Sequence, residues 1–376
     1  MHTAFGQSTP YSVGIEEEYQ LVDESGFGLV SRIEPLLASF AGEPESARVK
    51  PELLQSFVEV STKVATGIAE AVDDLVELRA RLRRVAAEQD TAIISAGSHP
   101  FSYPSAQVVT ARPRYARIAD DLGWLASGHL VFGLHVHVGV NSAEKAIACC
   151  AGVRAYLPEL LALSGNSPYW NGEATGLAST RATILTRLPR SGPPPHFETF
   201  QDFEELVERS TRTGCIPEYT HIWWDVRPHP QLGTVEVRIC DAQTRIESTA
   251  ALAALVQSVV ATVSSAWECG EYPATVPDFL LEENRWRSAR DGLDAVLIDV
   301  ENDTERSARA SVAALLDRCQ PAADALGCAD ELSQIEVVMD RGNGADEQRA
   351  VFEESGSLVD LARFLVDETS GSLARR

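Results

Sequence analysis

The sequence predicts an α+β fold in which helices cover one face of a sheet and polar side chains occupy the other. Several short segments alternate apolar and polar residues with the period of two that a β-strand requires, and each has one apolar face. Longer segments between and after them repeat apolar residues at helical spacing, most of all in the last third of the chain. Because no linker separates these parts, we expect a single domain over residues 1–376.

The first expected strand runs from Val13 to Val22 and places two carboxylates, Glu16 and Glu18, on the same face. Its other face is apolar apart from Glu17. Two carboxylates at this spacing repel each other in water and cost more free energy when they are buried. A divalent cation such as Mg²⁺ removes that conflict, because hard cations bind carboxylate oxygens. The alternative, which this strand alone leaves open, is the solvated face of an edge strand.

Three further segments show the same alternation, at residues 57–62, 132–140 and 234–240. Their polar faces carry Glu59, His135, His137, Glu236 and Arg238. Solvated strand faces carry Lys, Thr and Ser more often than two histidines between glycines, and such glycines leave room for a ligand beside the backbone. We therefore expect the four segments to form one polar floor that binds metal ions.

The elements between these strands are assigned from periodicity and turn residues. We expect a hairpin return at 27–30, helices at 67–89, 115–127 and 143–164, and a strand at 92–97. Arg79 lies in the first helix with three neighbouring arginines, and we interpret them as a solvated helix face rather than an anion site.

Residues 165–200 contain Gly and Pro throughout and show no periodicity. A structureless stretch of this length inside a compact domain is usually functional, so we expect a loop that covers the site. Trp170, Ser179 and Arg181 are its candidates for lining a pocket. The alternative is a surface loop without a function.

The remaining elements include one long apolar segment at 249–267. Because Glu247 and Glu268 close it tightly, we interpret it as a helix in the protein core rather than a membrane span. The other expected elements are helices at 203–213, 284–300, 307–326 and 349–366, and a strand at 221–227.

Charge and cysteine content disfavour several classes of protein. The chain has 32 basic and 55 acidic residues and a formal net charge of −23, whereas nucleic acids and anionic membranes bind basic patches. Its seven cysteines include no C-x-x-C pair, so we expect neither a disulfide framework nor a zinc knuckle, and a reducing cytoplasm as the location. Residues 1–10 lack the basic and apolar regions of a signal peptide.

The common nucleotide-binding and hydrolase motifs are missing from the sequence. There is no G-x-x-x-x-G-K-[ST] loop, no G-x-G-x-x-G after a strand, no G-x-S-x-G and no H-E-x-x-H. The carboxylates of the polar floor exceed what one Mg²⁺ needs, so two or more ions that bridge a polyphosphate would use them better. Arg238 would then neutralise phosphoryl oxygens. The residues alone therefore indicate metal-dependent phosphoryl chemistry.

Several motifs, in order along nearly the whole chain, resemble those of the carboxylate–amine ligase family, also called type 2 glutamate–cysteine ligases. They lie at residues 14–19, 97–100, 133–139, 223–228, 233–244, 284–287 and 342–346. The resemblance implies a glutamine synthetase-like α+β fold: a curved, largely antiparallel sheet whose concave face holds ATP and Mg²⁺, with Mn²⁺ as an alternative ion. In such enzymes a carboxylate attacks the γ-phosphate of ATP, and an amine captures the acyl phosphate to give an amide, ADP and phosphate. The formal substrates are glutamate and cysteine.

The same resemblance implies roles for individual residues. The positions that match metal ligands are Glu16, Glu18, Glu59, His137 and Glu236. Arg238 matches the arginine that contacts the phosphates, His135 shares this face and is a candidate for nucleotide binding, and Arg181 is a candidate clamp for a substrate carboxylate. Ala174 replaces a common acidic residue and Lys63 an expected proline, and both differences bear on the substrate. The implied partners are small-molecule carboxylates and amines such as amino acids, and a homodimer is left open.

Two other functions are open at this point. A metal-dependent hydrolase could bind Zn²⁺ through His135 and His137, although the other histidines lack the spacing of further ligands. A non-catalytic descendant could bind a nucleotide or an amino acid. Its expected mark is the loss of a ligand from the polar floor, and the sequence shows no such loss.

Overall fold

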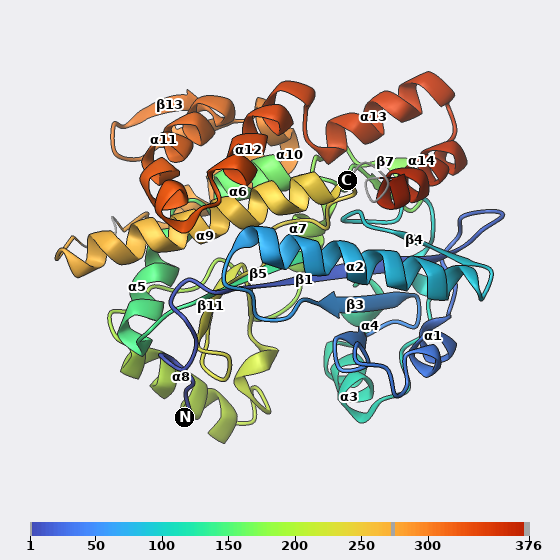
Figure 1. Cartoon of the computed structure of the whole chain (residues 1–376), viewed down its shortest axis with the longest axis horizontal. Coiled ribbons are helices and arrows are strands. Elements are labelled where there is room, and N and C mark those ends of the chain that lie inside the picture. Colours follow the sequence, from blue (N-terminus) through green and yellow to red (C-terminus); the bar gives the residue numbers. More distant parts are fainter. Residues whose placement is uncertain (1, 272–274, 372–376) are drawn as a thin grey trace.

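The computed structural model describes residues 2–271 and 275–371, and a seven-stranded sheet runs through its centre (Figure 1). The strand order is β10-β11-β5-β1-β3-β2, and β4 pairs with the far end of β1. Every pairing in this sheet is antiparallel. The strands are β1 (Val13–Asp23), β2 (Val49–Pro51), β3 (Phe57–Ser61), β4 (Thr91–Ile94), β5 (Leu134–Gly139), β10 (Val226–His229) and β11 (Thr234–Val237).

The register of the central strands places their polar residues next to one another. Glu18 of β1 lies opposite Glu59 of β3, and Glu16 lies opposite His135 of β5. On the other side of β5, His137 lies opposite Glu236 of β11. Because directly opposite residues point to the same face, all six side chains share one face of the sheet.

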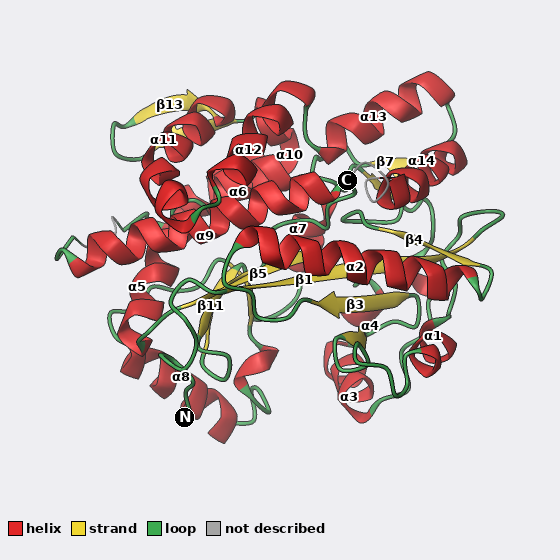
Figure 2. Ribbon diagram, viewed as in Figure 1, coloured by secondary structure: helices red, strands yellow, loops and turns green. Residues whose placement is uncertain are grey.

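The apolar face of the sheet is covered by helices (Figure 2). The helices in contact with its central strands are α2 (Ile68–Ala87), α5 (Ala143–Arg154) and α9 (Ile246–Glu268). Ile15, Val136 and Val235 of the strands belong to one buried cluster with Leu75 and Leu255 of these helices. In α9, 83% of the most apolar window is buried inside the structure, so its interpretation as a core helix is confirmed.

The other helices pack around this core or form the walls over the polar face. They are α1 (Ile33–Ser39), α3 (Pro113–Leu122), α4 (Trp124–Ser127), α6 (Leu157–Ser164), α7 (Thr180–Leu185), α8 (Phe200–Arg212), α10 (Asp278–Asp291), α11 (Ala308–Leu326), α12 (Ala329–Arg341), α13 (Gly344–Ser355) and α14 (Leu358–Gly371). Short two-stranded pairings join β6 (Tyr169–Trp170) to β7 (Glu173–Ala174), β8 (Ser191–Gly192) to β9 (Trp223–Trp224), and β12 (Val296–Asp299) to β13 (Thr304–Ser307). Short 3₁₀ turns occupy Pro104–Ala106, Tyr219–His221 and Gly292–Asp294.

The expectation of a structureless loop at 165–200 is wrong. This segment forms the β6–β7 hairpin, α7 and β8. It is tied to the end of the sheet by the buried carboxylate of Asp241, which accepts hydrogen bonds from the hydroxyls of Ser167 (2.6 Å) and Ser179 (2.8 Å) and from the backbone N–H of Asn166 (2.9 Å). The Gly and Pro residues therefore mark turns between short elements.

The interpretation of Arg79 as solvated is also wrong. Its side chain is fully buried and pairs with Glu17, the one acidic residue on the apolar face of β1. A helix face with four arginines suggests solvent exposure, but one of these positions lies under the sheet. There Glu17 needs a cationic partner, because an unpaired buried carboxylate is costly.

Several element boundaries differ from the predicted ones. The helix expected over 284–300 ends at Asp291, where Gly292 has a φ of +57° and the β12–β13 hairpin follows. Gly356, at a φ of +65°, similarly divides the helix expected over 349–366 into α13 and α14.

Other departures are smaller. The helix expected over 143–164 is two helices, α5 and α6, bent by 61°. The return of 27–30 beside β1 forms as a short antiparallel bridge between Val22 and Leu29, with backbone hydrogen bonds from Asp23 to Gly28 and from Val30 to Leu21. The strand expected over 221–227 is divided into β9, which pairs with β8, and β10, which belongs to the main sheet. β10 continues through Pro228 to His229, because it lies at the edge of the sheet, where a proline is tolerated.

Candidate active site

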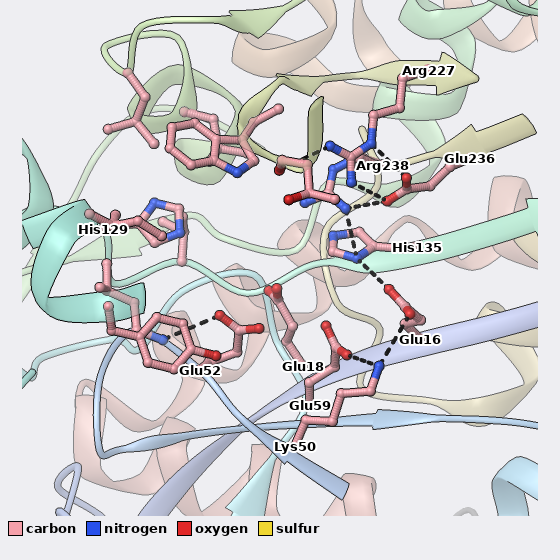
Figure 3. Close-up of a pocket in the computed structure, with 18 of the residues that line it drawn as sticks. Glu16, Glu18, Lys50, Glu52, Glu59, His129, His135, Arg227, Glu236 and Arg238 are labelled. Atoms are coloured by element: carbon pink, nitrogen blue, oxygen red, sulfur yellow. Dashed lines mark hydrogen bonds and ion pairs between the residues drawn. The ribbon is translucent and has the colours of Figure 1, made fainter. Parts of the chain in front are cut away.

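A cavity of about 460 Å³ lies over the polar face of the sheet (Figure 3). Its floor is formed by β1, β3, β5 and β11, and its walls come from β2, α3, α7 and the segment around β9 and β10. All eight site residues named from the sequence line it: Glu16, Glu18, Glu59, His135, His137, Arg181, Glu236 and Arg238. The alternation of four strands therefore located the floor of one cavity.

Two groups of side chains in the floor are close enough to hold metal ions. One consists of Glu16, His137 and Glu236, and the other of Glu16, Glu59 and His135. In each group, one potential ligand atom from every residue lies within 4.8 Å of the others. Because Glu16 belongs to both, the groups adjoin each other. Carboxylate-rich groups of this kind suit Mg²⁺ or Mn²⁺ better than softer ions.

The two histidines of the floor have nitrogens that a metal ion would satisfy. Their Nε2 atoms are buried and have no hydrogen-bond partner in the described part of the chain. The other ring nitrogen of His137 lies 3.0 Å from the hydroxyl of Thr234, which fixes the orientation of the ring. A buried polar atom without a partner is unusual in a protein. Together with the neighbouring carboxylates, these nitrogens fit a metal ion.

Glu18 faces the same cavity but belongs to neither group. Its Oε2 accepts a hydrogen bond of 2.5 Å from the backbone N–H of Gly133. This contact orients the carboxylate, and its other oxygen accepts no hydrogen bond from the part of the chain that the structure describes. The structure thus separates Glu18 from the other four metal ligands that the sequence named.

Glu236 is held by two arginines. Arg227 donates from Nε to Oε2 (2.6 Å) and from Nη2 to Oε1 (3.2 Å), and Nη1 of Arg238 donates to Oε1. Burial by itself would raise the pKa of Glu236, but the charges of Arg227 and Arg238 hold it well below its usual range. Glu236 therefore stays ionised. Sequence reasoning did not name Arg227 as a site residue, although β10 places it opposite Glu236.

Lys50 of β2 is a second residue that the sequence analysis missed. Its Nζ lies 3.0 Å from Oε1 of Glu59 and 3.7 Å from Oε1 of Glu16. Burial, reinforced by the charge of Glu16, raises the pKa of Glu59 to about 7, while Lys50 acts in the opposite direction. Lys50 therefore occupies the position of a cation between two candidate metal ligands.

Arg181 lies in α7 and is buried against the end of β11. Its Nη1 donates to the carbonyl of Ile239 and its Nη2 to the carbonyl of Arg238, both at 2.9 Å. These bonds fasten α7 to the strand that carries Glu236. Arg181 also lines the cavity wall. Its contact with a substrate carboxylate is a proposal.

The two positions that depart from the family pattern lie outside the cavity lining. The side chain of Lys63 is 72% exposed and lies 3.6 Å from Asp74. Ala174 is exposed on β7. Neither residue contributes to the polar floor.

Comparison with known proteins gives a consistent result. The sequence model of glutamate-cysteine ligase family 2 matches residues 12–364. A protein of Rubrobacter xylanophilus with the provisional name glutamate–cysteine ligase 2-3 is 42% identical over 370 residues, which cover 98% of this chain and 100% of that one. A protein of Sorangium cellulosum with the provisional name glutamate–cysteine ligase 2 is 42% identical over 361 residues, or 96% of each chain.

Among solved structures, a glutamate–cysteine ligase from Francisella tularensis in complex with AMP is similar to this chain, with a TM-score of 0.72 at 13% identity. The match covers 98% of this chain and 94% of the other. At this identity the likeness concerns the fold alone, and it confirms the predicted glutamine synthetase-like α+β fold.

Proposed function

The chain belongs to glutamate–cysteine ligase family 2, and from that premise we propose that it is an ATP-dependent carboxylate–amine ligase. The formal reaction of the family name joins the γ-carboxylate of glutamate to the amine of cysteine. The observation that carries the proposal is the floor of the cavity, where two adjoining groups of potential metal ligands share Glu16 and lie beside Arg238. The seven free cysteines support a cytoplasmic location.

The proposed reaction has two steps. A carboxylate oxygen of the first substrate attacks the γ-phosphorus of ATP, the bond to the bridging oxygen breaks, and ADP leaves. The amine nitrogen then attacks the carbonyl carbon of the acyl phosphate, the carbon–oxygen bond to phosphate breaks, and an amide forms. Overall, a carboxylate, an ammonium ion and ATP give an amide, ADP, phosphate and one proton.

The residues of the floor suit the first step. Glu16, Glu59, Glu236, His135 and His137 would hold the ions, and Glu18 would complete the set. Bound Mg²⁺ supplies positive charge that screens the polyphosphate and orients it for displacement. The guanidinium of Arg238 lies beside Glu236 in the cavity, from where it would neutralise the charge that develops on the phosphoryl oxygens.

The arrangement gives less support to the two other functions. A zinc hydrolase would use His135 and His137 together, but each lies in a different group with two carboxylates. A descendant that only binds would be expected to lose ligands from the floor. All five metal ligands inferred from the sequence line the cavity.

Hydroxamate formation tests the ligase directly. Hydroxylamine replaces the amine, so a panel of carboxylates can be screened with Mg²⁺ and ATP before the natural amine is known. We expect hydroxamate and ADP to form together with at least one carboxylate, and Glu16→Gln to abolish both. Carboxylate-independent ATP hydrolysis, or activity supported by Zn²⁺ and not by Mg²⁺ or Mn²⁺, would contradict the proposal.

A further inference from the structure

The cavity has a second region, built around Glu52, that the reaction with ATP does not use. Glu52 follows β2 directly, and the hydroxyl of Tyr115 in α3 donates to the carbonyl of Pro51 (2.5 Å), which ties the helix to this strand end. Leu53, next to Glu52 in the chain, belongs to one apolar cluster with Ile118, against which Tyr115, Leu122 and Trp223 pack, and all five line the cavity. We call this the Glu52 region.

The carboxylate of Glu52 has no cationic partner. In residues 2–271 and 275–371 its one hydrogen-bond donor is the backbone N–H of Leu53 at 3.2 Å, and it forms no ion pair. The basic side chains of the cavity wall are all engaged elsewhere. Lys50 pairs with Glu59 and Glu16, Arg227 and Arg238 pair with Glu236, Arg114 pairs with Glu218, and Arg181 binds backbone carbonyls.

A metal ion and a phosphate are both poor occupants of this region. Glu52 belongs to neither group of potential metal ligands. Burial, reinforced by the charges of Glu59 and Glu18, raises the pKa of Glu52 well above its usual range, so the ionised form of Glu52 needs a cation beside it. A phosphate brings no such cation, and the carboxyl groups of Glu52 and Glu18 face the cavity on the side away from Arg227 (Figure 3). The same side holds His129, whose buried Nδ1 has no hydrogen-bond partner in the described part of the chain. An organic cation fits better, because its N–H groups can donate hydrogen bonds to the carboxylate of Glu52.

We propose that the Glu52 region binds the amine substrate, with Glu52 accepting hydrogen bonds from its ammonium group and the apolar wall contacting its carbon substituent. This inference rests on the proposed ligase function, since it concerns the second substrate of that reaction. The substrate class is a primary amine, cationic in solution, with an apolar carbon next to the nitrogen. Charge-assisted hydrogen bonds to a partly buried carboxylate are stronger than neutral ones, so Glu52 would select ammonium over uncharged groups.

The position of Glu52 in the cavity supports its role in binding the amine. Glu18 and Glu59 separate Glu52 from Arg227 along the cavity, so an amine beside Glu52 would approach the floor from the side opposite the arginines (Figure 3). The acyl phosphate forms over the floor. Glu52 is therefore a residue of amine specificity and not a metal ligand.

Competition against hydroxylamine provides the test. Hydroxylamine is uncharged near neutral pH and lacks a carbon substituent, so its capture of the acyl phosphate depends little on Glu52. Propylamine, which is cationic at the same pH, should inhibit hydroxamate formation competitively with hydroxylamine, whether or not it is itself joined. In Glu52→Gln the inhibition constant of propylamine should rise by roughly 10- to 100-fold, the scale of one charge-assisted hydrogen bond, and the KM for hydroxylamine by much less.

Two further variants and a second amine serve as controls for the role of Glu52. Glu52→Asp keeps the charge on a shorter side chain and should give an intermediate inhibition constant. Glu43→Gln changes an exposed acid outside the cavity and should match the wild type. Methylamine should compete roughly tenfold less well than propylamine, because it lacks two methylene groups that the apolar wall would contact.

The outcomes separate this inference from the proposed function. If the wild type forms no hydroxamate with any carboxylate, the ligase function fails and the amine site fails with it. If hydroxamate forms but propylamine does not compete with hydroxylamine, only the assignment of Glu52 is overturned. The same holds if Glu52→Gln raises the inhibition constant of propylamine and the KM for hydroxylamine equally. A rise in the KM for ATP alone would assign Glu52 to the nucleotide and would likewise overturn it.

Discussion

Glu17 and Arg79 form a fully buried ion pair, 2.9 Å apart, directly behind the strand whose neighbouring residues Glu16 and Glu18 face the cavity. The pair is part of a network: Thr249 donates to Glu17 (2.6 Å), and Nε of Arg79 donates to the hydroxyl of Tyr19 (2.9 Å). Arg79 also donates to the carbonyls of Gln243 and Thr244 beyond β11. The network connects α2, β1 and α9 at one point under the floor.

Loss of Arg79 should therefore destabilise the protein strongly. Arg79→Leu leaves the carboxylate of Glu17 buried without its cation, so we expect a loss of about 3–5 kcal/mol in the free energy of unfolding. Urea denaturation measures it. The double variant Glu17→Gln/Arg79→Leu removes both charges and should recover part of the loss. A single variant within about 1 kcal/mol of the wild type, the scale of an exposed pair, would contradict the prediction.

Arg238 should contribute to turnover and little to stability. Because Arg227 holds Glu236 by two hydrogen bonds of its own, Glu236 keeps a partner in Arg238→Ala. We expect an intact fold and a kcat lower by roughly 10²–10³, the effect of one preorganised donor to developing charge. Arg238→Lys should recover only part, because lysine lacks the planar fork.

One result would contradict the proposed role of Arg238. A folded Arg238→Ala variant that binds Mg²⁺-ATP and turns over within about threefold of the wild type, far from the expected loss, would leave Arg238 as an ion-pair partner of Glu236 only. Arg227→Ala is the matched comparison. It removes the bidentate partner of Glu236 and should reduce stability more than Arg238→Ala does.

Metal binding should depend on Glu16 more than on any other ligand. Glu16 belongs to both groups of potential ligands, whereas Glu59 and Glu236 belong to one each. In a titration with Mn²⁺ followed by electron paramagnetic resonance, Glu16→Gln should lose binding at both sites and Glu59→Gln at one. Identical stoichiometries in the two variants would show that the groups do not act as separate sites. Mg²⁺ should displace Mn²⁺, as expected for oxygen-rich ligands.

Acid should destabilise the protein through His99. Its Nε2 lies 2.8 Å from the carbonyl of Phe27, and its Nδ1 accepts hydrogen bonds from the backbone N–H groups of Phe101 (3.2 Å) and Ser102 (2.9 Å). Burial lowers the pKa of His99 from 6.5 to about 4, although the bond to Phe27 acts in the opposite direction. Protonation in the folded state would break both contacts at Nδ1.

The unfolded chain therefore binds more protons than the folded one between pH 6.5 and 4. Stability should fall as the pH is lowered through this window, by about 3 kcal/mol from this residue, and no further below it. Urea denaturation across the range measures the slope. In His99→Gln the slope should be smaller by up to about one proton, and an unchanged slope would assign the acid sensitivity to other groups.

The sequence by itself determined which side chains face the cavity. The two-residue period of a strand is a local property, so Glu16, Glu18, Glu59, His135, His137, Glu236 and Arg238 could be assigned to one polar face before any pairing was known. Helical spacing of apolar residues identified α2, and a long apolar segment without charged residues identified α9. The motifs along the chain also predicted the family and its fold.

Only the tertiary structure decided how these residues are grouped and what surrounds them. The pairing register of the strands makes Glu16 common to both groups of potential metal ligands and leaves Glu18 in neither. Lys50, Glu52 and Arg227 enter the cavity from strand ends and edges, where the alternation is too short to show which face a side chain occupies. Such positions depend on contacts between segments far apart in the chain, as does the burial of Arg79 beneath β1. Periodicity reports which way a side chain points within its own element, and packing alone determines what it meets there.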